Sequence, residues 1–170
     1  MIFLANRTNL DKRTLLTRIH TQLQSQAAGD DAPIKQVRYH TSSGNKVGVR
    51  ALLDAQAFLG STHPGGEVEL HASFDFPPNR DYDFYEIQWV EPDRKLMLGW
   101  HQDDTHMDLG NCHFQIDYQS ETVQRTSADF LDAHPLNVFE RRLDQFIPIL
   151  DVLTWEDELP TVPNHAIGGD

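Results

Sequence analysis

The alternation of apolar and polar residues between Leu96 and Tyr118 constrains the fold of this chain more than any other feature. On either side of a polar centre, apolar residues occupy every second position: Leu96, Leu98 and Trp100, then Cys112, Phe114, Ile116 and Tyr118. A period of two is typical of half-buried strands. The pattern therefore predicts an antiparallel hairpin with its loop at residues 102–112.

Further alternating runs extend this hairpin into a larger sheet. The clearest lies between Val68 and Phe76, a second surrounds Ile87, and a short one covers Glu121 to Thr126. The segments between them are rich in Pro, Asn, Asp and Arg, which favour turns. We therefore expect an antiparallel meander of four to five strands.

Two stretches have the spacing of helices rather than strands. Leu10–Ala28 carries apolar residues at helical intervals, and a second stripe runs through Pro135–Val152. Between them, Ile34–His40 and Val47–Leu53 read as a hairpin. We predict an α+β fold, in which the C-terminal helix packs on one face of the meander and an N-terminal helix and β-hairpin precede it.

The Gly- and Pro-containing segment at residues 60–66 is the clearest linker in the chain. It suggests a division into an N-terminal helix and hairpin at 1–65 and a main sheet with its helix at 66–155. Residues 156–170 contain two prolines and two glycines and read as a poorly ordered C-terminal tail.

Composition points to an acidic protein of a salt-rich cytoplasm. The formal charge is −12, with 18 Asp against 8 Glu and 10 Arg against 4 Lys. Such a surface is suited to a halophile, because molar salt shortens the Debye length to about 3 Å and screens self-repulsion. The alternative is an ordinary acidic protein of a mesophile. The single cysteine fits a reducing compartment, and no apolar run reaches the length of a membrane span.

The polar centre of the hairpin holds the candidate functional residues. If Trp100 lies opposite Phe114, then His101 lies opposite His113, with Cβ atoms about 4.5–5.5 Å apart. A four-residue turn at Glu91–Arg94 would also pair Phe84 with His101. The candidate catalytic residues are two strand histidines and two residues of the loop between them: His101, Asp104, His106 and His113.

Three interpretations of this cluster remain open. Neutral imidazoles with a carboxylate could bind a divalent metal, although the spacing matches no standard zinc pattern. A protonated and a neutral imidazole could instead act as the acid and base of metal-independent RNA cleavage. The third interpretation is a solvated loop without chemistry. Nearby, His71 and Glu86 share the polar face, whereas Arg141 and Arg142 are expected to be surface charges.

Two resemblances bear on function. The words WHQDDTH at 100–106, CHFQ at 112–115 and DAHPLNVFERRL at 132–143 resemble a group of uncharacterised haloarchaeal proteins. More distantly, a strand, a His/Asp-rich loop and a second strand resemble the TumE family of toxin–antitoxin toxins, with LGWH at 98–101 in place of the R-Y-D-N segment of that family. This second resemblance implies a toxin that acts on RNA or its translation and binds an antitoxin.

The alternative to an enzyme is a non-catalytic protein-interaction or metal-binding module. It would bind a partner, or form a homodimer, through the hairpin at residues 34–53 or the apolar stripe of the first helix, formed by Leu15, Ile19 and Leu23.

Overall fold

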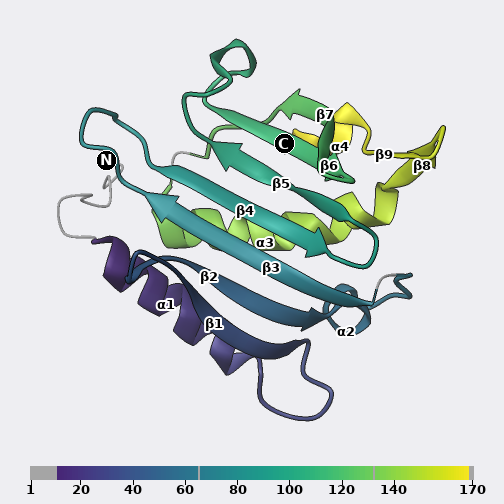
Figure 1. Cartoon of the computed structure of the whole chain (residues 1–170), viewed down its shortest axis with the longest axis horizontal. Coiled ribbons are helices and arrows are strands. Elements are labelled where there is room, and N and C mark those ends of the chain that lie inside the picture. Colours follow the sequence, from purple (N-terminus) through teal and green to yellow (C-terminus); the bar gives the residue numbers. More distant parts are fainter. Residues whose placement is uncertain (1–10, 65, 132, 169–170) are drawn as a thin grey trace.

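The computed structural model describes residues 11–64, 66–131 and 133–168, and its central feature is a seven-stranded antiparallel sheet (Figure 1). The strands are β1 (Ile34–Ser42), β2 (Asn45–Asp54), β3 (Glu67–Asp75), β4 (Phe84–Glu91), β5 (Leu96–Gln102), β6 (Cys112–Tyr118) and β7 (Glu121–Ser127). The other elements are α1 (Lys12–Ser25), α2 (Ala55–Leu59), a 3₁₀ turn at Met107–Leu109, α3 (Pro135–Val152), the hairpin β8 (Thr154–Glu156) and β9 (Leu159–Thr161), and α4 (Asn164–Ile167).

Each strand of the sheet pairs with its neighbour in the sequence, in the order β1 to β7. The predicted N-terminal hairpin is β1–β2, and it joins the main sheet because β2 pairs with β3 from Gly48–Ser73 to Asp54–Glu67. The boundary expected near residue 65 therefore falls between two hydrogen-bonded strands of one sheet.

Both long helices lie on the same face of the sheet, where α1 and α3 also contact each other (Figure 1). The helix α1 begins after Asp11, whose carboxylate accepts a hydrogen bond from the amide of Thr14 at 2.7 Å. Leu10, predicted to start this helix, lies outside the described residues. The helix α3 has the predicted bounds. Pro135 is favourable in its first turn, because an amide N–H at that position would have no partner within the helix.

The apolar parity of the strands forms the core beneath these helices. Trp89 and Trp100 are fully buried, and their rings lie 5.9 and 5.0 Å from the ring of Phe146 on α3. Phe139 of α3 is also completely buried. The α+β architecture and the placement of the C-terminal helix are therefore confirmed.

The C-terminal tail differs from the prediction, because most of it is structured. The side-chain amide of Gln124 on β7 binds both the carbonyl oxygen of Val162, at 2.8 Å, and its backbone amide, at 2.9 Å. Val162 and Ile167 are buried against the core. These apolar contacts and the amide pair hold a segment whose prolines and glycines suggested poor order.

Among the described residues, we find no helix that combines the length and the hydrophobicity needed to cross a membrane.

Candidate active site

The face of the sheet opposite the helices is open and polar, and its side chains form rows across the strands. One row runs through His40, Gly48, Ser73, Glu86, His101, His113 and Ser127. The next runs through Arg38, Arg50, His71, Gln88, Gly99, Gln115 and Arg125. Strands from both ends of the sequence therefore contribute titratable groups to one surface.

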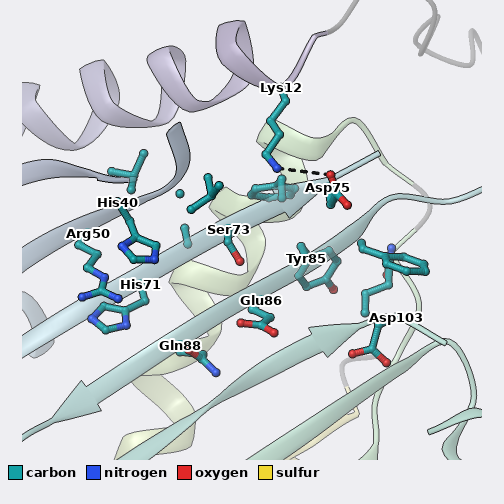
Figure 2. A pocket seen from close by; sticks show the side chains of 17 residues that line it. Lys12, His40, Arg50, His71, Ser73, Asp75, Tyr85, Glu86, Gln88 and Asp103 are labelled. Carbon is teal, nitrogen blue, oxygen red and sulfur yellow. Dashed lines mark hydrogen bonds and ion pairs between the residues drawn. The ribbon is translucent and has the colours of Figure 1, made fainter. Parts of the chain in front are cut away.

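A groove of about 430 Å³ lies along this face over β1 to β5, and Lys12 of α1 and the core-facing Tyr85 also line it. This volume lies within the range of small-molecule sites. Figure 2 shows His40, Arg50 and His71 together at one end, and Asp75 and Asp103 at the other. Gly48 contributes no side chain to the floor, and a Cβ there would lie 2.6 Å from the carbonyl oxygen of Ala72.

A carboxylate–imidazole pair lies at the cationic end of the groove. Nε2 of His71 is 2.7 Å from Oε2 of Glu69, two residues earlier on the same face of β3. Burial lowers the pKa of His71 below 6.5, and the charges of Arg50 and His40 lower it further, against the opposing hydrogen bond with Glu69. The ring is therefore neutral at neutral pH. Because the ring proton lies on Nε2 and is donated to Glu69, Nδ1 carries no proton and can accept one.

Glu86 and Gln88 of β4 lie in the middle of the groove, between the Glu69–His71 pair and the predicted histidine His101. Glu86 lies between Ser73 and His101 in the register. The side-chain amide of Gln88, which lines the groove, donates to Nε2 of His101 at 3.0 Å. A ring that accepts this bond is neutral, which agrees with burial lowering the pKa of His101.

The structure brings the three predicted histidines together beside the groove. The ring of His113 lies 5.2 Å from that of His101 and 5.0 Å, edge-on, from that of His106. His113 is only 2% exposed, and its Nε2 has no hydrogen-bond partner among the described residues. Burial lowers the pKa of His113 to about 4, and repulsion between protons on His113 and His101 contributes to the shift.

The fourth predicted residue, Asp104, does not join them. Its exposed carboxylate pairs with the guanidinium of Arg80, whose Nε lies 3.2 Å from it. The preceding residue, Asp103, lines the groove instead, and its charge acts on both His101 and His113. Among the residues that the structure describes, no three His, Cys, Asp or Glu side chains are arranged to hold a metal ion.

The register prediction was half right. Trp100 faces Phe114 and His101 faces His113, as the alternation required. The predicted pairing of Phe84 with His101 is wrong, because Glu86 occupies that position. The turn lies one residue later than expected, with Glu91 paired to Leu96, because Lys95 adopts a left-handed backbone with φ of 51°.

Arg142 also contradicts its prediction as a surface charge, since its side chain is fully buried. Its guanidinium donates to the hydroxyl of Tyr85 at 3.1 Å and to the carbonyl oxygen of Asp129 at 2.6 Å. Burial raises the pKa of Tyr85, so this hydroxyl stays protonated. Because Tyr85 lines the groove, Arg142 connects α3 to the groove floor.

Two groove residues, His40 and Arg50, were absent from the predicted site. Both lie in the hairpin that the sequence separated from the main sheet. The sequence did contain an indication of these residues. Arg38 and His40 occupy alternate positions on β1, and Arg50 is a polar residue among the apolar ones of β2, so all three were candidates for the polar face. What sequence did not supply is the pairing of β2 with β3, which places Arg50 opposite His71.

Comparison of the chain with protein-family models, curated proteins and solved structures finds no match.

Proposed function

We propose that this protein cleaves RNA at the cationic end of the groove, with His71 as general base, His40 as general acid and Arg50 as the phosphate-binding group. The supporting observation is that all three side chains line one groove, with His71 held by Glu69 at 2.7 Å. This is the acid–base chemistry that was one of the three interpretations open from the sequence, assigned here to a different pair of histidines.

The proposed reaction is an internal transesterification. Nδ1 of His71 removes the proton of a ribose 2′-hydroxyl, and the 2′-oxygen attacks the adjacent phosphorus. The bond between phosphorus and the 5′-oxygen breaks, and His40 donates a proton to that oxygen. The products are a 2′,3′-cyclic phosphate and a free 5′-hydroxyl. Glu69 stabilises the imidazolium that forms on His71, and Arg50 stabilises the charge that develops on the phosphoryl oxygens.

The overall charge of −12 opposes RNA binding at low salt. Molar salt screens this long-range repulsion and leaves the short contacts of the groove less affected. We therefore propose that the protein acts in a salt-rich cytoplasm.

The resemblance to TumE-type toxins extends the proposal to a cellular role. A ribonuclease of this kind would be toxic unless a second protein inhibited it. The groove is open on the face that carries no helix, so an antitoxin that covered it would exclude RNA.

Cleavage of a labelled RNA in molar KCl tests the proposal. His71→Ala should lower the rate by about 10²–10⁴-fold, the usual contribution of a general base. Glu69→Gln should lower it less, and His165→Ala, which removes an exposed histidine on α4, should leave it unchanged. On the acidic limb of a bell-shaped pH profile, the rate should rise through the lowered pKa of His71, and the activity should persist in a chelator.

Three results would contradict this function. Activity that a chelator abolishes would favour a metal site, and full activity of His71→Ala would move the chemistry elsewhere. RNA binding without cleavage would favour the non-catalytic module.

A further inference from the structure

An aromatic side chain flanked by two carboxylates lies at the opposite end of the groove. Phe84 pairs with Asp75 on β3. On its other side, the β4–β5 ladder ends where Tyr85 pairs with Gln102, and Asp103 follows directly after β5. Asp75, Phe84 and Asp103 all line the groove (Figure 2 labels the two aspartates), so the ring shares this end of the groove with two carboxylates.

Phe84 belongs to a cluster of three rings at the rim. The ring of Tyr82 lies 5.8 Å from that of Phe84, and the ring of Phe130 lies 5.9 Å from that of Tyr82 at an interplanar angle of 89°. Phe130 is 42% exposed, and the other two are half-buried. Rings that remain accessible beside a polar groove can stack with flat ligands.

The position of this cluster relates it to the proposed reaction centre. Phe84 precedes Glu86 by two residues on the same face of β4, about 7 Å along the strand, and Gln88 lies opposite His71 two residues further on. Residues of both ends line the same groove. Phe84 therefore lies about 14 Å along β4 from the position opposite His71, so a phosphate at Arg50 and a base at Phe84 belong to different nucleotides of one RNA strand.

We propose that the Phe84 end of the groove is a nucleobase subsite that selects guanine. This inference rests on the proposed function, since it names the nucleotide that the same groove takes. The base stacks on Phe84 beside Tyr82, as single-stranded bases do on aromatic side chains. A carboxylate of Asp103 accepts hydrogen bonds from the Watson–Crick edge of the base.

Guanine is the base that fits these acceptors. Its Watson–Crick edge presents two adjacent N–H donors, N1–H and the 2-amino group, which match the two oxygens of one carboxylate. Adenine and cytosine offer one amino group beside an acceptor nitrogen that a carboxylate repels, and uracil offers one N–H between two carbonyls. Asp75 is already paired with Lys12 at 3.3 Å. Among the described residues, Asp103 accepts a hydrogen bond from the backbone amide of Thr105 at 2.8 Å and forms no ion pair, which leaves Asp103 as the selecting residue.

Nucleoside binding to the full-length protein tests the subsite without the reaction. Guanosine, adenosine, cytidine and uridine carry no phosphate, so their affinities in molar KCl, measured by NMR chemical-shift titration, report the base site alone. We expect guanosine to bind about tenfold more tightly than the other three. Phe84→Ala should weaken guanosine binding about tenfold, and Asp103→Asn should remove the preference for guanine while retaining stacking. Trp155→Ala, which removes a 40% exposed ring on β8, is the matched control.

The outcomes separate this inference from the proposed function. Guanosine binding that depends on Phe84 and Asp103 supports the subsite even if no RNA is cleaved. RNA cleavage that depends on His71, together with equal binding of the four nucleosides or an unaffected Phe84→Ala variant, would overturn the subsite and leave the ribonuclease standing. A preference for another base would also overturn it.

Discussion

His113 should make the free energy of unfolding decrease strongly as the pH falls. Its ring lies on the face of the sheet opposite the helices, where neighbouring side chains bury it. Its Nε2 has no hydrogen-bond partner among the described residues. The substitution His113→Phe keeps an aromatic ring of similar size and leaves no polar group of its own unpaired. The variant therefore removes the titration while it keeps the packing against His101 and His106.

The direction of the effect follows from the lowered pKa. In the unfolded chain the imidazole takes up a proton near pH 6.5, whereas in the folded protein its pKa is about 4. Above pH 6.5 the ring is neutral in both states. As the pH falls from 6.5 to about 4, only the unfolded state binds the proton, so the free energy of unfolding decreases. At 1.36 kcal/mol per pH unit, the loss is at most about 3 kcal/mol.

Urea unfolding of both proteins between about pH 7 and about pH 4.5 measures this loss. The carboxylates titrate in both proteins, so the difference between wild type and His113→Phe reports His113 together with its coupling to His101. Wild type should lose about 2–3 kcal/mol more than the variant over this range. The exposed His165, changed to Phe, should not alter the wild-type curve. A difference that stays constant with pH would refute the burial argument, as would an NMR titration of the His113 ring near 6.5.

Three further predictions concern the core, the sheet and the surface. Phe139→Ala should lower the free energy of unfolding by about 3–5 kcal/mol, and a loss below about 1 kcal/mol would mean that α3 is not packed as described. Gly99→Ala should prevent folding, because its Cβ would lie 2.1 Å from the carbonyl oxygen of Ile87. Gly168→Ala should be tolerated, because there is open space around that position. Circular dichroism of the two variants tests both expectations. The melting temperature should rise from about 0.1 M to about 2 M KCl, since 26 acids face 14 bases; an unchanged value would remove the halophile hypothesis.

The parts of the fold that follow from local pattern were predictable. The alternation around Trp100 and Phe114 fixes which side chains face the core, and a shift of one residue would expose both rings. This is why His101 and His113 were correctly placed opposite each other. The helix at Pro135–Val152 was likewise visible, because its apolar stripe and its N-terminal proline agree.

The groove was not predictable, because it depends on features that have no local signature. The pairing of β2 with β3 brings Arg50 beside His71 across a connection with a helical turn of its own. Lys95 in a left-handed conformation moves the β4–β5 register by two residues and exchanges Phe84 for Glu86 opposite His101. Burial of Arg142 depends on Tyr85, which is 57 residues away in the chain.

The order of the strands has a consequence for how the chain folds. Because each strand of the sheet pairs with the one before it, the sheet can grow strand by strand during synthesis, without long loop closures. The groove residues from Lys12 to Asp103 are all present well before α3 is made. Until Pro135–Val152 arrives, however, Trp89 and Trp100 lack the ring of Phe146. A nascent or truncated chain that ends before α3 therefore exposes an aromatic sheet face, and aggregation of that intermediate competes with completion of the fold.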